Sequence, residues 1–574
     1  TAVGYQAGVA ITTGTHNVAL GSNSLDACTT GTENVAAGHA SLGAVTDSTA
    51  NTAVGHNSGA SITTGDSNTF FGHQSGDATT TASNNTGVGK DALGANTTGT
   101  QNTAIGVSSL VDNTTGDYNT GLGYIALFEN TTGASNTATG NGALRNNTTA
   151  SNNTATGYHA LHQNTTGAEN VAVGALSLDA NTTGANNVAV GRNALSGNTT
   201  AANNTAIGDS CMFLNTTGAN NTAVGNGALI ANTEGDANTS LGFNSFAANT
   251  TASGGVAIGN RALDANTTGD YNVGIGHDAL GVNTTGTLNV AVGGTALDAN
   301  TTGTQNVAVG YGALSANTTA SNNVAVGKNA LTLNTTGTSN NAIGENALAA
   351  NTTGTNNTGI GHNALVANTE AIHNTGIGNL ALAAVTTGTR NTCVGSGAGD
   401  AITTGSKHTI VGRYNGNTGG LDIRTATNNI VLADGDGNPR VQIDGNGVFK
   451  VPYVYSDTNG SAANVHIGSD GRFYRSTSSR RYKNTIEDAT HGLTELLALR
   501  PVTYKGNNNG DLVFGGLIAE EVHDAGLTEF VQYNDDNEPD ALAYGNMVSL
   551  CIKAIQEQQA TITALTARIE ALEA

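Results

Sequence analysis

Residues 181–197 read NTTGANNVAVGRNALSG, and this 17-residue pattern decides the fold of most of the chain. Its first four residues, Asn-Thr-Thr-Gly, return at whole multiples of this period, and degenerate copies fill the gaps. The same phase runs from Ile11 to Ile402 without a slip, which makes 24 repeats. A disordered tract has no reason to hold such a register, whereas a solenoid requires it because each repeat stacks on the previous one. The full tetrad begins at Asn96, Asn113, Asn130, Asn164, Asn181, Asn215, Asn266, Asn283, Asn300, Asn334 and Asn351.

Each repeat contains one short β-prone run followed by an Ala-Leu pair, which are NVAVG and Ala194-Leu195 in the repeat quoted above. Side chains alternate between the two faces of a strand. We therefore expect Val190 to enter the core together with the leucine, and Ala189 to lie on the opposite face. Glycines at fixed positions predict corners where the backbone needs positive φ or close packing. No proline precedes Pro439, which fits coils whose backbone N–H groups all bond to the neighbouring coil.

The recurring Asn and Thr side chains have several candidate roles. Stacked on successive coils, they form amide and hydroxyl hydrogen-bond ladders, which is the structural interpretation. They also offer a surface to a receptor or a glycan, and Asn-Thr-Thr fits the acceptor motif for N-glycosylation in a eukaryotic host. Threonine ladders suit ice binding as well, although these pairs lie at a glycine corner and do not alternate along a flat strand.

Composition agrees with a repeat array and disfavours several classes of function. The chain has 574 residues, of which 79 are glycine and only 11% are charged. Its net charge of −22 argues against nucleic-acid binding, because phosphate backbones require clustered Lys and Arg. Four cysteines lie far apart without a Cys-x-x-Cys pair, so we predict no disulfide framework, no metal site and no cofactor. No apolar run reaches the roughly 20 residues that span a bilayer, so no membrane insertion is expected.

The repeat phase ends near Gly412, and the sequence changes character in residues 413–477, which we interpret as a β-rich connector. Asp434, Asp436 and Asn438 have the spacing of a calcium loop, but the EF-hand pattern also needs a Glu at its twelfth position and flanking helices. A hairpin turn is the prediction for this loop. Short strands separated by Gly, Asp and Asn turns are predicted at 430–432, 441–443 and 448–451.

Residues 465–574, about a fifth of the chain, carry a series of recognisable motifs: VHIGSDGRFYR at 465–475, STSSRRYK at 476–483, LRPVTY at 499–504 and GLIAEEV at 516–522. In this order they resemble the endosialidase-type intramolecular chaperone domain at the C-termini of phage tail spikes and related fibres. The repeats are similar to the β-roll heads of trimeric autotransporter adhesins, whose shorter repeat also carries an N-x-A-x-G run. Asn-Thr-Thr-Gly repeats of phage and algal-virus fibres look closer still.

The chaperone resemblance implies a serine peptidase that cuts its own chain once. In that family a serine and a lysine five residues later form the catalytic dyad, and the cut falls immediately before the serine. Carried over to this sequence, the nucleophile is Ser478, the base is Lys483 and the scissile bond is Thr477–Ser478. Arg481 matches the family's arginine. Glu521 matches an acidic position that would orient the dyad.

One residue departs from the family pattern. Ser479 stands where the residue after the nucleophile is commonly Asp, so Ser476 and Ser479 are rival nucleophiles, although the spacing to Lys483 favours Ser478. The chemistry is reasonable in itself, because a serine hydroxyl needs a base to remove its proton. A lysine serves as that base when burial or a neighbouring cation favours its neutral form. Without the surrounding motifs, the same residues would be interpreted as a solvated basic turn.

The last segment, about 546–574, has the spacing of a coiled coil. Ile555, Ile562 and Ile569 lie seven residues apart, and so do Leu565 and Leu572. Such a seam packs against other helices but does not by itself fix their number. The family resemblance implies three chains.

Together these features predict an all-β shaft, a trimeric β-solenoid or β-roll with a 17-residue period, over residues 1–412. The connector 413–477 follows, and residues 478–574 form a small α+β chaperone domain that ends in a coiled-coil helix. We expect a homotrimeric fibre, located in the virion or on an extracellular surface, whose partner is a host-cell receptor such as a glycan.

Two other functions remain open at this point. The first is a bacterial or extracellular trimeric adhesin that uses the same chaperone. The second is a glycan-degrading tail spike, which is disfavoured because the even repeat leaves no room for a catalytic carboxylate pair. The chain opens inside a repeat, at Thr1, so we expect an upstream attachment domain whose type would separate a fibre from an adhesin.

Overall fold

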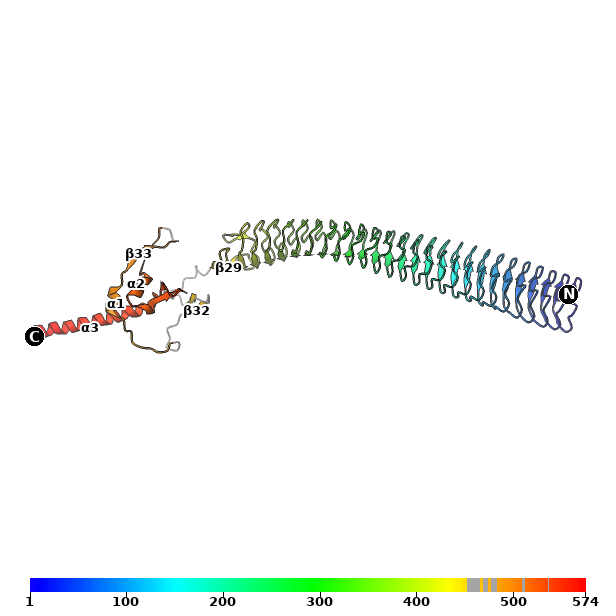
Figure 1. Ribbon diagram of the computed structural model, residues 1–574, viewed down its shortest axis with the longest axis horizontal. Helices are drawn as coiled ribbons and strands as arrows, with labels where there is room; N and C mark the ends of the chain where they lie inside the picture. Colours follow the sequence, from blue (N-terminus) through cyan, green and yellow to red (C-terminus); the bar gives the residue numbers. More distant parts are fainter. Residues whose placement is uncertain (452–464, 468–472, 476–482, 508–510, 535) are drawn as a thin grey trace. The chain divides into compact units, whose positions relative to one another are not determined.

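The computed structural model describes residues 1–574 except 452–464, 468–472, 476–482, 508–510 and 535. The chain divides into two units, Thr1–Asp457 and Thr458–Ala574, and each has its own hydrophobic core. The first unit is a long β-solenoid (Figure 1), and the second is a small domain with few strands and a C-terminal helix. The predicted fold class, a 17-residue β-solenoid followed by a small helix-ending domain, is confirmed.

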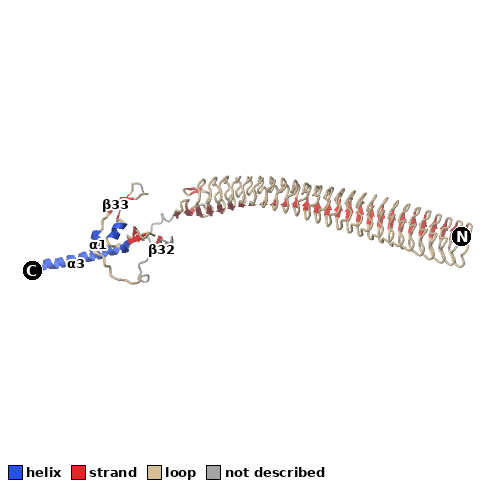
Figure 2. Ribbon diagram, in the orientation of Figure 1, coloured by secondary structure: helices blue, strands red, loops and turns tan. Residues whose placement is uncertain are grey.

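Short parallel strands line one side of the solenoid (Figure 2). Each strand pairs with the strand one turn later in the register set by the repeat, as in the pairing of Ala189 with Ala206. The strands of the regular repeats are β1 (Ala2–Val3), β2 (Val18–Leu20), β3 (Val35–Ala37), β4 (Thr52–Val54), β5 (Thr69–Phe71), β6 (Thr86–Val88), β7 (Thr103–Ile105), β8 (Thr120–Leu122), β9 (Thr137–Thr139), β10 (Thr154–Thr156), β11 (Val171–Val173), β12 (Val188–Val190), β13 (Thr205–Ile207), β14 (Thr222–Val224), β15 (Thr239–Leu241), β16 (Val256–Ile258), β17 (Val273–Ile275), β18 (Val290–Val292), β19 (Val307–Val309), β20 (Val324–Val326), β21 (Asn341–Ile343), β22 (Thr358–Ile360), β23 (Thr375–Ile377), β24 (Thr392–Val394) and β25 (Thr409–Val411).

The interior of the solenoid is filled by small and medium-sized side chains. In the quoted repeat, Ala189, Ala194 and Leu195 are fully buried, and most other turns bury the equivalent residues. The prediction that Val190 enters the core was wrong, because it lies on the outer face of its strand, and the equivalent Ile207 is 40% exposed. The turn encloses a narrow space, so alanine fits at most inward strand positions. A residue as large as Phe70 is buried there because the neighbouring core position is Gly76, where a Cβ would lie 2.4 Å from the ring.

Each turn bends sharply at the glycine that follows the strand. Gly191 has a φ of 136°, and a Cβ added there would lie 2.3 Å from the carbonyl oxygen of Gly208 in the next turn. The predicted glycine corner is confirmed, because both the backbone conformation and this contact exclude a side chain. The buried leucine also has a positive φ, 52° at Leu195, and its burial offsets the steric penalty of that conformation.

Two columns of buried asparagines run inside the solenoid. In the corner column, the Nδ2 of Asn198 donates to the Oδ1 of Asn181 at 2.8 Å and to the carbonyl oxygen of Ala201 at 3.0 Å. In the strand column, the backbone N–H of Asn187 donates to the Oδ1 of Asn170 at 3.0 Å, and its Nδ2 donates to the carbonyl oxygen of Ala201 at 2.9 Å. Side-chain amides therefore bridge successive turns, which confirms the predicted amide ladder.

The corner also carries a column of threonines, in which the Oγ1 of Thr182 donates to the carbonyl oxygen of Thr199 at 3.0 Å. The corner asparagines are fully buried, and the Nδ2 of Asn181 already donates to the Oδ1 of Asn164 at 2.8 Å and to the carbonyl oxygen of Gly184 at 2.9 Å. A glycan on this nitrogen is incompatible with the coil. The Asn-Thr-Thr motifs of the folded solenoid are therefore structural and not glycosylation sites.

One junction between turns lacks a rung in both asparagine columns. Phe246 occupies the core leucine position, and Gly255 occupies the strand-column position, where a Cβ would lie 2.5 Å from the Phe246 ring. Without a side chain, Gly255 offers no oxygen to the N–H of Asn272. In the corner column, the buried Oδ1 of Asn249 has no hydrogen-bond partner within the described residues, and the Nδ2 of Asn266 donates within its own turn. We call this place the Phe246–Gly255 junction.

The regular solenoid ends after β25. The next strand of its sheet, β28, is parallel to β25 but in a longer turn, with Ile430 opposite Thr409. Two further strands of the same sheet, β29 and β30, are antiparallel, so the three strands predicted in this region are confirmed. The elements are the hairpin β26 (Asn417–Thr418) and β27 (Leu421–Asp422), then β28 (Ile430–Ala433), β29 (Pro439–Ile443) and β30 (Phe449–Lys450).

Asp434 forms the hairpin turn between β28 and β29. One of its carboxylate oxygens accepts the N–H groups of Asn438 at 2.9 Å and Asp436 at 3.1 Å, and the other pairs with Arg440 at 2.5 Å. The backbone hydrogen bond from Asn438 and the Arg440 guanidinium lower the pKa of Asp434 to about 2. The predicted hairpin turn is confirmed, and the Asp434 carboxylate stabilises it through these hydrogen bonds.

The second unit packs short helices and hairpins around a small core that includes Val522, Leu527, Phe530 and Leu550. The helix predicted over about 546–574 is present as α3. The elements are β31 (Val465–Ile467), β32 (Phe473–Arg475), α1 (Leu493–Ala498), β33 (Val502–Lys505), β34 (Val513–Gly516), α2 (Ala519–Asp524), the 3-10 helix η2 (Thr528–Phe530), β35 (Val531–Tyr533), β36 (Pro539–Leu542) and α3 (Val548–Glu573).

The strand column predicts the effect of removing one rung. Asn119→Ala leaves the buried N–H of Asn136 without its acceptor, the Oδ1 of Asn119 at 3.0 Å. We expect a loss of about 1–3 kcal/mol of local stability, the cost of an unsatisfied buried donor. Hydrogen exchange at Asn136 measures it. Thr115→Ala, at an exposed corner position, is the control and should change stability by less than about 0.5 kcal/mol. An equal loss of stability in the two variants would show that the Asn119 side chain does not stabilise the column.

The strand column ends with a titratable group, which predicts a pH dependence. His408 replaces asparagine there: its Nδ1 accepts the N–H of Asn429 at 3.2 Å, and burial lowers its pKa. The folded imidazole stays neutral where the unfolded one, below about pH 6.5, binds a proton, so stability falls with falling pH. We expect exchange at Asn429, corrected for its intrinsic rate, to accelerate between about pH 7.5 and about pH 5. His408→Asn should abolish the acceleration, and its persistence in that variant would exclude His408 as the cause.

Candidate functional site

The residues predicted for self-cleavage are only partly placed. Thr477, Ser478 and Arg481 lie outside the described residues. Lys483 is described and is exposed, and Glu521 lies on α2. The arrangement of the Ser478–Lys483 dyad therefore stays a prediction, while the surroundings of Glu521 can be described.

Glu521 is held by an arginine. Arg500 donates to both carboxylate oxygens of Glu521, and the bond from its Nε to Oε2 is 3.2 Å long. This hydrogen-bonded pairing lowers the pKa of Glu521. Both side chains are exposed, so solvent screens the attraction, and its main effect is to join α2 to the segment before β33. Arg500 belongs to the LRPVTY motif, but sequence reasoning gave it no role because its partner lies 21 residues away.

The two motifs that contain these residues meet in space. β33 and β34 pair antiparallel, with Val502 opposite Gly516, so LRPVTY and GLIAEEV lie side by side. Next to them, the hydroxyl of Tyr544 accepts the N–H of Leu517 at 2.7 Å and donates to its carbonyl oxygen at 3.2 Å. A Cβ on Gly516 would lie 2.6 Å from that hydroxyl, so the glycine permits the contact.

An apolar cavity of about 540 Å³ opens beside this hairpin. Its walls come from α1, from the hairpin and from the start of α3, and Cys551 is among them. The walls supply few polar groups, so the cavity suits an apolar side chain better than a hydrolytic reaction. It is lined by Leu496, Leu499, Pro501, Gly516, Leu517, Tyr544, Met547, Val548 and Cys551.

Helix α3 packs only at its beginning. Leu550 and Ala554 are buried against the small core, and the carboxylate of Glu557 accepts the N–H of Leu493 at 2.8 Å. The residues of the predicted seam are exposed, Leu572 to 79%. An amphipathic helix with an uncovered seam is stable when other helices cover it. The exposed seam comprises Val548, Ile552, Ile555, Ile562, Leu565, Ile569 and Leu572.

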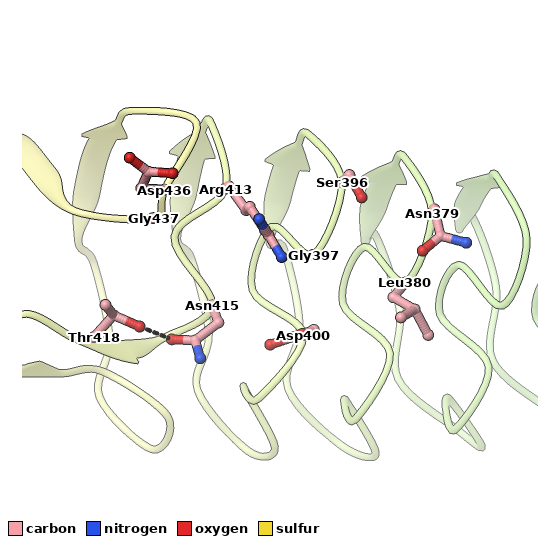
Figure 3. Close-up of a pocket in the computed structure, with 10 residues that line it drawn as sticks. All are labelled: Asn379, Leu380, Ser396, Gly397, Asp400, Arg413, Asn415, Thr418, Asp436 and Gly437. Atoms are coloured by element: carbon pink, nitrogen blue, oxygen red, sulfur yellow. Dashed lines mark hydrogen bonds between the residues drawn. The ribbon is translucent and has the colours of Figure 1, made fainter.

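The end of the solenoid carries a polar hollow of about 340 Å³ (Figure 3). It forms where Gly397 follows Leu380 at the same position of the repeat, so that a side chain is missing from the column. The side chain of Arg413 extends beside this gap, and Asp400 and Asn415 line the hollow below it. Burial raises the pKa of Asp400, and Arg413 opposes that shift.

Hydrogen-bond donors and acceptors stand close together in this hollow, which suits a ligand rich in hydroxyl groups. The signal that would have located it in the sequence is the glycine at 397, where the repeat usually has a larger residue. Among the described residues, no group of three or more His, Cys, Asp or Glu side chains could hold a metal ion. Within the same part of the chain, every helix is too short or too polar to cross a membrane.

Comparison with known proteins adds no relative: no family model, no curated protein and no solved structure matches this chain. The functional residues are therefore identified by their own contacts and by the motifs of the sequence.

Proposed function

We propose that the chain is one protomer of a homotrimeric fibre of a virion, used for attachment to a host cell, and that its C-terminal chaperone drives trimer folding. The observation that carries this proposal is the uncovered heptad seam of α3 in a chain whose other unit is a long regular solenoid. In such a fibre the terminal coiled coil would hold the chains together, and the repetitive rod would form the shaft. The polar hollow near Arg413 is a candidate contact for a glycan receptor.

The need for a chaperone follows from folding physics. Parallel strands of neighbouring turns, and the faces of separate chains, must find their register through non-local contacts, which is slow and exposes sticky edges. A coiled coil at one end holds the chains together at high effective concentration, so the rods pair from a fixed starting point. Release of this domain after folding removes the nucleus for unfolding and leaves a kinetically stable fibre.

In the proposed cleavage, the Oγ of Ser478 attacks the carbonyl carbon of Thr477 while Lys483 takes the hydroxyl proton. The Thr477–Ser478 amide bond breaks, an ester to Oγ forms, and the proton passes to the departing α-amino group of Ser478. Water then hydrolyses the ester and frees the two chains. Arg481 is the neighbouring cation that favours a neutral lysine. The Arg500–Glu521 pair joins the two motifs, and orienting the dyad is the role proposed for Glu521.

The first prediction concerns the cut itself. Denaturing electrophoresis of the expressed full chain should show a fragment of about 97 residues, 478–574, and Ser478→Ala and Lys483→Ala should each reduce it at least about 100-fold, the usual scale for a lost nucleophile or base. Ser476→Ala and Ser479→Ala are the matched controls and should be cut. Persistence of the fragment in both Ser478→Ala and Lys483→Ala would overturn the dyad.

The second prediction concerns assembly through α3. In the Ser478→Ala background, which keeps α3 on the chain, Ile562→Asp combined with Ile569→Asp places charges in the seam. The chains then lack the nucleus from which the rods pair, and the protein should sediment with the mass of one chain instead of three. Thr563→Asp combined with Ala567→Asp adds the same charge to the outer side of the helix and should leave the trimer intact. A trimer that survives the seam variant would show that α3 does not hold the chains together.

A further inference from the structure

Each strand of the solenoid has two side chains that point away from the core. In β19 they are Val307 and Val309, on either side of the buried Ala308. We call the surface made by these outward residues of β2 to β25 the strand face. The first outward position is always Val or Thr, apart from Asn341. The second is aliphatic or aromatic in every strand except those with Ala37, Thr139 and Thr156.

The strand face is uncharged, although the chain as a whole is strongly acidic. Of 42 acidic and 20 basic residues, none occupies an outward position of β2 to β25. Its apolar side chains are open to solvent, with Phe71 56% and Leu241 46% exposed. The core of one chain does not need these side chains, because alanine fills the inward position. An exposed row that is apolar in most turns is typical of an interaction surface.

We propose that two further copies of this chain cover the strand face, so that three solenoids pack along their strands. The inference rests on the proposed trimeric fibre and locates its contact within the shaft. A second copy brings the same face with the same spacing, about 4.8 Å per turn, so side chains interdigitate turn by turn. A trimer gives each copy two neighbours, and each strand offers two outward side chains, one toward each neighbour.

The size of the strand face agrees with a stable assembly. Strands spaced by about 4.8 Å give a face roughly 115 Å long over β2 to β25, and a width of about 10 Å makes about 1,100 Å² per copy. Shared between two neighbours, this area gives each pair of copies a contact of about 1,100 Å² counted over both sides, which is above the roughly 1,000 Å² that a biological interface should bury. A receptor engages a local patch and gives no reason for an apolar pattern that recurs along nearly the whole shaft, whereas a partner with the same repeat does.

The test places one thiol on the strand face of the full chain. Val309→Cys is combined with Cys551→Ser, which removes the exposed native thiol, while Cys28, Cys211 and Cys393 are buried. A short-spacer bismaleimide should convert this variant into covalent dimers and trimers on a denaturing gel. Thr319→Cys in the same background, at an exposed corner of the neighbouring turn, should remain mostly single chains.

Sedimentation of the same proteins separates the two ways of failing. A single-chain mass for both the unchanged chain and the Cys551→Ser parent overturns the trimer, and the strand-face contact with it. A trimer in which Val309→Cys cross-links no more than Thr319→Cys overturns the strand-face contact alone and leaves the proposed fibre standing.

A second pair of variants tests the same contact without cross-linking. Lysines on the strand face should cause loss of the trimer at a denaturant concentration at which the unchanged chain and a matched corner variant remain trimeric. Equal resistance of the two variants would overturn the proposal. The strand-face variant is Val292→Lys, Val309→Lys and Val326→Lys, and the corner variant is Thr302→Lys, Thr319→Lys and Thr336→Lys.

Discussion

The hydrogen bond from a buried asparagine amide to the next turn is the interaction on which the solenoid depends. A turn this short is too thin to hold a large apolar core, so alanine and leucine fill the centre and asparagine fills the corners. In that dry space an unpaired amide would cost more than it contributes, but a column of amides satisfies itself. Asn187, for example, both donates to the corner carbonyl of the next turn and takes part in the column on either side. Register is thereby fixed at every junction between turns that has an amide rung, which excludes the Phe246–Gly255 junction.

The sequence predicted the repeat, its glycine corners and its amide columns because these depend on spacing alone. It could not predict which strand face is inside: alternation defines two faces, and only the width of the closed coil decides that Ala189, and not Val190, enters it. The candidate site was likewise predictable only in part. Glu521 was identified from a motif, but its pairing with Arg500 depends on a hairpin that brings distant residues together, and the segment around Ser478 stays a prediction.

The valines and isoleucines of the strands point outward, so they do not contribute to the core of the single chain. Within a single chain, small side chains fill the core of the solenoid, and many larger apolar side chains lie outside, on the strands and on the seam of α3. Each unit therefore has its own hydrophobic core and also exposes a row of apolar side chains. Stability within the chain comes from amide columns, while in the proposed trimer cohesion between chains would come from dispersion and the hydrophobic effect. The two tasks are assigned to different residue types, so either can vary along the shaft without disturbing the other.

The Phe246–Gly255 junction has a mechanical consequence. In a rod where each turn touches only its neighbours, links act in series, and tensile load is carried equally by all of them. The junction keeps its backbone hydrogen bonds but lacks an amide rung in both columns, so fewer hydrogen bonds hold it than hold the neighbouring junctions. Under pulling, separation would begin there and leave two intact half-rods. In the proposed fibre, force at the tip would therefore act first on one phenylalanine and the glycine that makes room for it.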